Sequence, residues 1–60
     1  MSEKELVLAA YPEAIALQGF TWMIYDHPRM NNRQIGRGKT EQEAWLDAYF
    51  SLNEENTFDG

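Results

Sequence analysis

The chain contains no cysteine, so neither a disulfide bridge nor a thiolate metal site can hold its fold together. Its single histidine supplies too few ligands for a metal ion. No apolar run approaches the roughly 20 residues that span a bilayer, and the acidic, polar start lacks the apolar core of a signal peptide. These absences predict a soluble, cytoplasmic protein that does not contact membranes.

Sixty residues leave room for one small domain and exclude the large enzyme folds. The hydrophobic fraction of 43% and the charged fraction of 25% are those of an ordinary globular chain. A domain of this size buries only about 60% of the surface that its unfolded chain exposes, so its stability as a lone unit is marginal. Such domains often rely on a partner when they lack a covalent staple. We therefore expect the chain to bind another protein or a second copy of itself.

The N-terminal residues have the spacing of a helix start. Ser2 is followed three residues later by Glu5, which is the pattern of a capping box. The apolar residues that follow favour a helix, which Pro12 would interrupt. We expect one short or broken helix from about Glu3 to Leu17, with Gly19 after its end.

Residues 20–26 favour a strand because aromatic, β-branched and apolar side chains dominate them. Successive side chains of a strand point to opposite faces. One face would carry Phe20, Trp22 and Ile24, and the other face would carry Thr21, Met23 and Tyr25. Residues 26–32 are typical of a turn or loop, and a weaker strand is predicted over residues 33–37.

The clearest element is a helix after Thr40, which has the spacing of a second capping box with Glu43. Apolar side chains then recur at helical spacing, at Trp45, Ala48, Tyr49 and Leu52. Asn53 is the expected end of this helix. A flexible acidic tail is expected over residues 54–60.

Together these elements predict an α+β fold in a single domain of residues 1–53. The expected order is helix-strand-strand-helix, with a small antiparallel sheet of two or three strands and the helices packed on one of its faces. The strand over residues 20–26 is apolar on both sides, yet a chain this short cannot cover both. We therefore expect an open face that a partner could cover.

Several short motifs suggest chemistry but lack the rest of a site. The run Gly36-Arg37-Gly38-Lys39-Thr40 matches part of a phosphate-binding loop, but that motif needs a glycine where Arg33 stands. His27 lies in a predicted loop without further metal ligands at a matching spacing, and no hydroxyl residue has the setting of a nucleophile. We expect no catalytic residue, no metal and no cofactor, and hence a protein that is not an enzyme.

Charge is distributed unevenly along the chain, whose formal net charge is -5. Residues 27–39 contain no acidic side chain and four basic ones, Arg29, Arg33, Arg37 and Lys39. One alternative function is therefore weak nucleic-acid binding through the hairpin 29–39, although the acidic overall balance argues against it. A second alternative is an acidic mimic of nucleic acid that inhibits a nucleic-acid-handling enzyme. The simplest interpretation is that the basic segment pairs with acids on the helices.

The stretch Gly36-x-Gly38-Lys39-Thr40-x-x-Glu43-Ala44-Trp45-x-x-Ala48-Tyr49 resembles the C-terminal half of two small folds, the double-stranded-RNA-binding domain and the HicB-like antitoxin domain. The RNA-binding family has lysines at the helix start, where this chain has Glu41, Gln42 and Glu43. The resemblance therefore implies a similar fold rather than RNA binding. In style the whole chain is similar to small accessory proteins of bacteriophages and prophages, many of which bind a host protein.

The sequence favours a non-enzymatic protein–protein interaction module, of the kind that a phage encodes to bind a host protein. Arginine and aromatic side chains dominate the binding energy of interfaces in general. The candidate contact residues are three from the apolar strand and three from the basic segment: Trp22, Met23, Tyr25, Arg29, Arg33 and Arg37.

Overall fold

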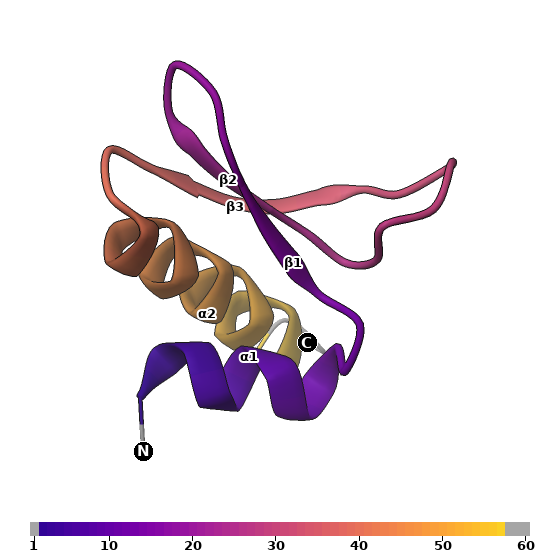
Figure 1. Ribbon diagram of the computed structural model, residues 1–60. Helices are drawn as coiled ribbons and strands as arrows, with labels where there is room; N and C mark the ends of the chain where they lie inside the picture. Colours follow the sequence, from indigo (N-terminus) through magenta and orange to yellow (C-terminus); the bar gives the residue numbers. More distant parts are fainter. Residues whose placement is uncertain (1, 58–60) are drawn as a thin grey trace.

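The computed structural model describes residues 2–57, which form two helices and a three-stranded antiparallel sheet (Figure 1). In chain order the elements are α1 Glu3–Ala10, β1 Ile15–Gln18, β2 Trp22–Tyr25, β3 Gln34–Gly38 and α2 Glu41–Thr57. The predicted α+β class with a small antiparallel sheet is confirmed. None of the helices in the described part is long and apolar enough to cross a membrane.

The central strand of the sheet is β2, with β1 and β3 at the two edges. The register between β1 and β2 is regular, with the opposing pairs Ile15–Tyr25, Ala16–Ile24, Leu17–Met23 and Gln18–Trp22. The register between β2 and β3 has one irregularity. Ile24 opposes Gly36 whereas Tyr25 opposes Gln34, which leaves Ile35 as the extra residue of a bulge.

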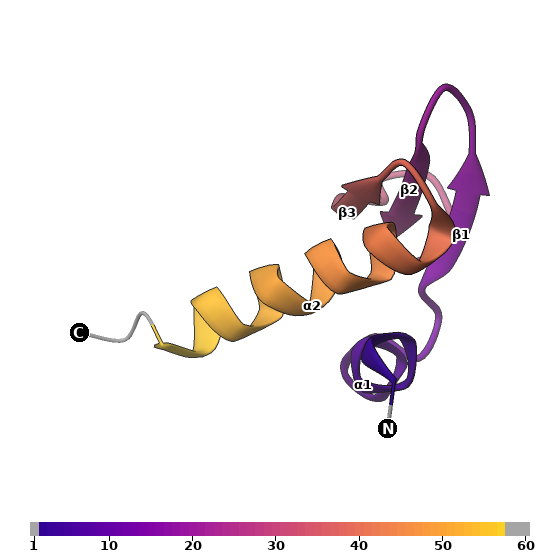
Figure 2. The same cartoon turned by 90° about the vertical axis from the view of Figure 1, so that its left-hand side faces the viewer.

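Both helices lie on the same side of the sheet (Figure 2). Helix α2 packs mainly on β3 and reaches over β2, while α1 packs against α2. The least exposed side chains come from both helices and the central strand: Val7, Ile24, Ala44, Trp45 and Ala48. Trp45, Ala48 and Tyr49 of the apolar stripe predicted for the second helix therefore line or adjoin the core, and within residues 2–57 no helix covers the far face of the sheet.

The two glycines of the Gly36-Arg37-Gly38 sequence allow α2 to pack closely on β3. A Cβ atom on Gly36 would lie 2.5 Å from the carbonyl oxygen of Ala44 and 2.7 Å from the Cβ of Ala48. A Cβ on Gly38 would lie 2.6 Å from the nitrogen of Ala44. Carbon atoms normally approach to about 3.5–4.0 Å, so any side chain here would push the helix away. Helix packing therefore accounts for this glycine pair.

The expectation of a helix that reaches Leu17 is wrong. Helix α1 ends at Ala10 because Pro12 has no N–H to donate and disfavours a helical conformation in the residue before it. The chain then turns, and the N–H of Ala14 donates to the carbonyl oxygen of Tyr11 at 3.0 Å. Proline is favoured at the second position of such a turn. The residues after the turn form β1, a strand that the predicted element order did not contain.

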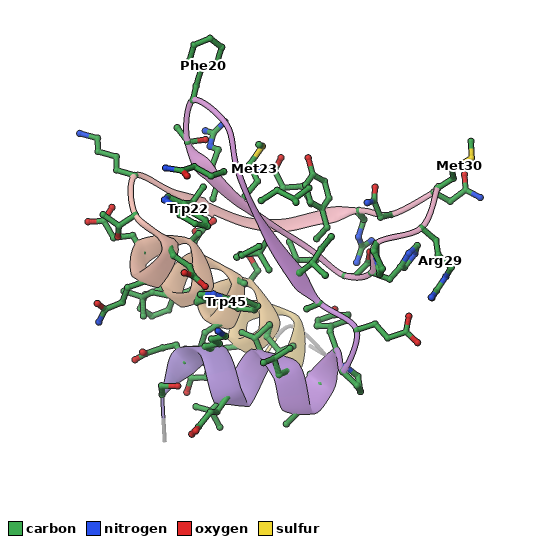
Figure 3. All side chains as sticks on the ribbon, viewed as in Figure 1. Phe20, Trp22, Met23, Arg29, Met30 and Trp45 are labelled. Carbon is green, nitrogen blue, oxygen red and sulfur yellow. The ribbon has the colours of Figure 1, made fainter. Side chains whose placement is uncertain are left out.

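Strand β2 begins two residues later than expected. Phe20 lies in the turn between β1 and β2, and its ring projects fully exposed from the tip of that turn (Figure 3). It therefore does not share a packed face with Trp22 and Ile24, which was the prediction. Trp22 and Ile24 themselves do lie together on the side of the helices.

The two helix starts follow their capping residues. The Ser2 hydroxyl accepts from the N–H of Glu5, and the Glu5 carboxylate accepts from the N–H of Ser2, each at 3.3 Å, which confirms the first capping box. The Thr40 hydroxyl accepts from the N–H of Glu43 at 3.2 Å, but the Glu43 carboxylate accepts from the N–H of Lys39. The second capping box is therefore only half formed.

Helix α2 continues to Thr57, so the expected helix end at Asn53 is wrong. The last three residues of the predicted tail, 58–60, lie outside the described residues.

Candidate functional site

The face of the sheet that points away from the helices carries four apolar side chains. Ala16 and Ile24 face the helices, so their neighbours along each strand point the other way. These neighbours form two opposing pairs, Ile15 with Tyr25 and Leu17 with Met23. We call the surface formed by Ile15, Leu17, Met23 and Tyr25 the outer face.

The outer face is open to solvent although its side chains are large. Leu17 is 47% exposed, and Ile15, Met23 and Tyr25 are half-buried. The hydroxyl of Tyr25 lies 3.7 Å from the Sδ atom of Met23, to which it donates a weak hydrogen bond. Figure 3 shows the Met23 side chain pointing away from the helices, whereas Trp22 points toward them. The face is thus a continuous apolar strip across β1 and β2.

A basic residue, Arg37 of β3, lies at one end of this strip. Arg37 opposes Met23 across β2 and β3, so it continues the row that Leu17 begins. Its neighbours Gly36 and Gly38 pack against α2, which directs the Arg37 side chain to the outer side of the sheet. Arg37 is exposed. The outer face therefore combines apolar side chains with a positive charge at its β3 side.

The structure brings together three of the six contact residues expected from sequence and separates the other three. Met23, Tyr25 and Arg37 lie on the outer face. Trp22 is half-buried on the opposite side of the sheet and packs against the core. The remaining two, Arg29 and Arg33, lie at the long loop between β2 and β3.

The loop between β2 and β3 is closed at its base by two residues that bond to each other. The N–H of Asp26 donates to the carbonyl oxygen of Arg33 at 3.1 Å, and the N–H of Arg33 donates to the Asp26 carboxylate at 3.0 Å. The second of these bonds favours the ionised carboxylate and lowers the pKa of Asp26 below its usual value. At the tip of the loop, Met30 is 90% exposed and Asn31 has a left-handed backbone with φ of 72°.

Two residues of this loop make contacts that bear on the predicted sites. The guanidinium of Arg29 forms an ion pair with the carboxylate of Glu13, in the turn before β1. This ion pair lies within the chain, but Glu13 belongs to a turn and not to a helix, whereas the sequence predicted pairing with acids on the helices. The Nδ1 atom of His27 accepts a hydrogen bond from the N–H of Arg29 at 3.2 Å, so this histidine helps to shape the loop.

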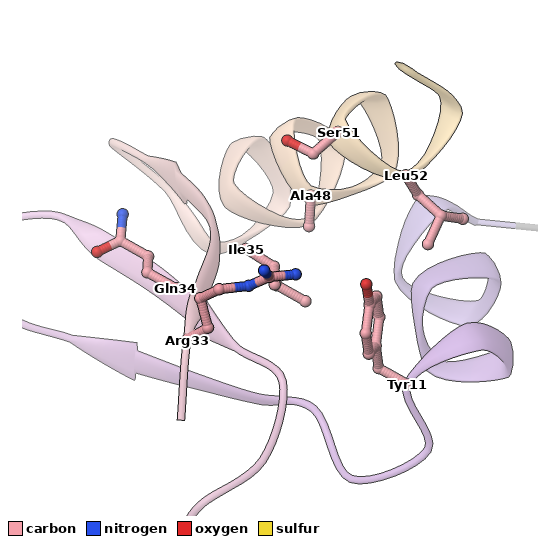
Figure 4. Close-up of a pocket in the computed structure, with 7 residues that line it drawn as sticks. All are labelled: Tyr11, Arg33, Gln34, Ile35, Ala48, Ser51 and Leu52. Carbon is pink, nitrogen blue, oxygen red and sulfur yellow. The ribbon is translucent and has the colours of Figure 1, made fainter. Parts of the chain in front are cut away.

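Arg33 lines a cavity of about 180 Å³ between β3, α2 and the end of α1. Figure 4 shows its guanidinium extending toward Tyr11, beneath Ala48 of α2. The other lining residues are Gln34, Ile35, Ser51 and Leu52. One cation, a phenol and apolar walls can accommodate a small molecule, but they do not pair a nucleophile with a base. The described residues also contain no cluster of three or more metal-ligating side chains.

Three acids in the first two turns of α2 make contacts within the chain. The Glu41 carboxylate accepts from the indole N–H of Trp45 at 3.0 Å and lies 3.7 Å from Lys4 Nζ. Glu43 and Asp47 accept from backbone N–H groups at the end of β3. These acids stabilise the fold, which weakens the alternative that they imitate a nucleic-acid backbone.

Sequence reasoning missed Ile15 and Leu17, which form half of the outer face. The sequence favours a helix that reaches Leu17, and in a helix the two side chains would not share a face by alternation. The available signal was the Pro12 turn on one side and Gly19 on the other, which bracket a segment of strand length.

No protein-family model, no curated protein and no solved structure matches this chain.

Proposed function

We propose that this chain is a non-enzymatic interaction module that binds another protein through the outer face of its sheet. The observation that supports the proposal is the open row formed by Leu17, Met23 and Arg37, one residue from each strand. The apolar members of this face lie together, and an exposed arginine stands beside them. Clustered apolar and arginine side chains are the usual source of binding energy in protein interfaces.

Charge complementarity specifies the kind of partner. The acids at the start of α2 lie on the helix side of the sheet, whereas Arg37 lies on the outer side. A protein that covers the outer face would therefore present an apolar patch with a carboxylate opposite Arg37. One source of such a partner is a host protein of a phage, because the sequence is similar in style to small phage accessory proteins.

The test begins with a photo-crosslinking amino acid at position 25, in the middle of the outer face. The captured protein is identified, purified and titrated against the wild-type chain by calorimetry. Tyr25→Ser and the double variant Met23→Ser, Tyr25→Ser should weaken binding by at least about tenfold, because truncating central interface side chains commonly costs that much.

Phe50→Ser is the matched control, since Phe50 is also an exposed aromatic residue but belongs to α2. It should leave the affinity unchanged. Arg37→Glu should weaken binding more than Arg37→Ala, because it places a like charge opposite the expected carboxylate. Capture of only a second copy at position 25, or equal losses in the Phe50 and Tyr25 variants, would rule the proposal out.

A further inference from the structure

The two edges of the sheet differ in their contacts with the rest of the chain. At the β3 edge, the carboxylate of Asp47 accepts from the N–H of Arg37 at 3.0 Å, and that of Glu43 accepts from the N–H of Lys39 at 3.2 Å. Both acids belong to α2. The helix therefore occupies one backbone donor within β3, at Arg37, and one just after its end, at Lys39, and another strand would need such donors to pair along this edge.

The β1 edge has no comparable protection. Among residues 2–57, β1 pairs with β2 alone, and its register is regular, without a bulge. Its sequence, Ile15–Gln18, contains no charged residue and no proline. Natural edge strands usually carry charges, prolines or bulges that prevent pairing with other chains. Figure 2 shows β1 at the margin of the molecule, with α2 running away from it. This edge is thus available for pairing.

We propose that two copies of the chain pair through β1, antiparallel and about a two-fold axis at Ala16. In an antiparallel pair, directly opposed side chains lie on the same face of the sheet. An axis at Ala16 sets Ile15 against Leu17 of the other copy and Ala16 against itself. Ile15, Ala16 and Leu17 then meet only apolar residues, Gln18 lies opposite Ala14 of the other copy, and the two members of each opposed pair lie on the same face. The strand is complementary to itself, which is the condition for a two-fold interface.

The protected β3 edges explain why pairing stops at two copies. Joining two three-stranded sheets through β1 gives a continuous six-stranded sheet whose outer strands are the two β3 strands. Both of these carry the Asp47 and Glu43 contacts, so neither end accepts a further strand. A closed dimer results rather than a fibre. The dimer leaves Met23 and Tyr25 exposed, so it is compatible with a partner on the outer face and does not depend on one.

The first test is the mass in solution, measured by light scattering and by sedimentation over a range of concentrations. The wild type should have about twice the chain mass of 7.0 kDa. Leu17→Lys should raise the dimer dissociation constant by at least about tenfold, because it removes an apolar contact on both sides of the axis. Phe50→Lys, the matched exposed apolar residue on α2, should leave the dimer intact.

The second test uses the absence of native cysteine, which makes introduced cysteines unambiguous. Ala16→Cys should form an inter-chain disulfide on mild oxidation, because directly opposed Cα atoms lie within the range that a disulfide spans. Arg37→Cys, at the protected edge, should not. If Ala16→Cys fails to fold, the double variant Ile15→Cys, Leu17→Cys tests the same register.

A wild type that is monomeric at millimolar concentration would overturn the proposal. So would a dimer that survives Leu17→Lys, or one that is cross-linked as readily through position 37 as through position 16. These outcomes are separate from those of the Tyr25 variants, which report only on the outer face.

Discussion

The carboxylate of Asp47 in α2 accepts a hydrogen bond from the backbone N–H of Arg37 in β3, at 3.0 Å. A helix side chain thereby satisfies a donor at the edge of the sheet. Asp47→Ala should lower the free energy of unfolding by about 1 kcal/mol, the usual net contribution of one hydrogen bond. Asp47→Asn keeps an acceptor oxygen, so its free energy of unfolding should fall by less than that of the alanine variant. Urea denaturation measures both, and an alanine variant as stable as the wild type would show that the contact has no stabilising effect.

The glycine at position 36 should tolerate no side chain. Gly36→Ala places a Cβ 2.5 Å from the Ala44 carbonyl oxygen, so α2 must move away from β3. Overpacking of this kind typically costs about 1–3 kcal/mol of stability. Gly19→Ala is the control, because its Cβ would lie 3.3 Å from the flexible end of Met23 and at an ordinary contact distance, 3.9 Å, from the carbonyl oxygen of Thr21. Thermal unfolding should show a large loss of stability for Gly36→Ala and a small loss for Gly19→Ala. Equal losses would contradict the packing explanation.

The second helix was predictable because its signals are local and agree with each other. The Thr40 cap and the apolar spacing from Trp45 to Leu52 lie within one short segment, and the structure places Trp45 and Ala48 in the core. Strand β1 was not predictable in the same way. Ile15, Ala16 and Leu17 fit a helix as well as a strand, and it is the pairing with β2 that decides between them.

Half of the outer face, Met23 and Tyr25, could be predicted from local sequence signals. The alternation of Met23 and Tyr25 with Trp22 and Ile24 is visible in the sequence, but their partners across the sheet are not. Which of the two sides faces the helices depends on the position of α2, and that position depends on the glycines of β3. The separation of Trp22 from Met23 therefore required the three-dimensional structure.

The order of the loop between β2 and β3 should depend on acid pH through Asp26. The N–H of Arg33 favours the ionised carboxylate and lowers the pKa of Asp26 in the folded chain. Its contribution to stability is therefore fully present above the ordinary carboxyl pKa of about 3.9. It is lost as the pH falls through the lowered folded value.

Amide NMR measures this effect at the Arg33 N–H. Its chemical shift in the wild type should follow a titration whose midpoint lies below that of an ordinary aspartate. Asp26→Asn should abolish the titration and make the chain less stable at neutral pH, and the difference from the wild type should shrink as the pH falls below about 4. An Arg33 amide that does not respond to acid would show that the hydrogen bond is not formed in solution.

The basic segment should not hold nucleic acid at physiological ionic strength. Arg29 is already paired with Glu13, and the formal net charge of -5 repels a polyanion. Filter binding of a labelled DNA duplex and of an RNA duplex should show at most weak retention at low salt, with none at about 0.15 M.

The matched variant is the triple substitution Arg33→Ala, Arg37→Ala, Lys39→Ala, which should behave like the wild type at the higher salt. Retention by the wild type at that salt, with a log–log slope near -2.7, would instead indicate three phosphate contacts with duplex DNA. If the triple variant removed that retention, these three basic residues would be the ones that contact nucleic acid.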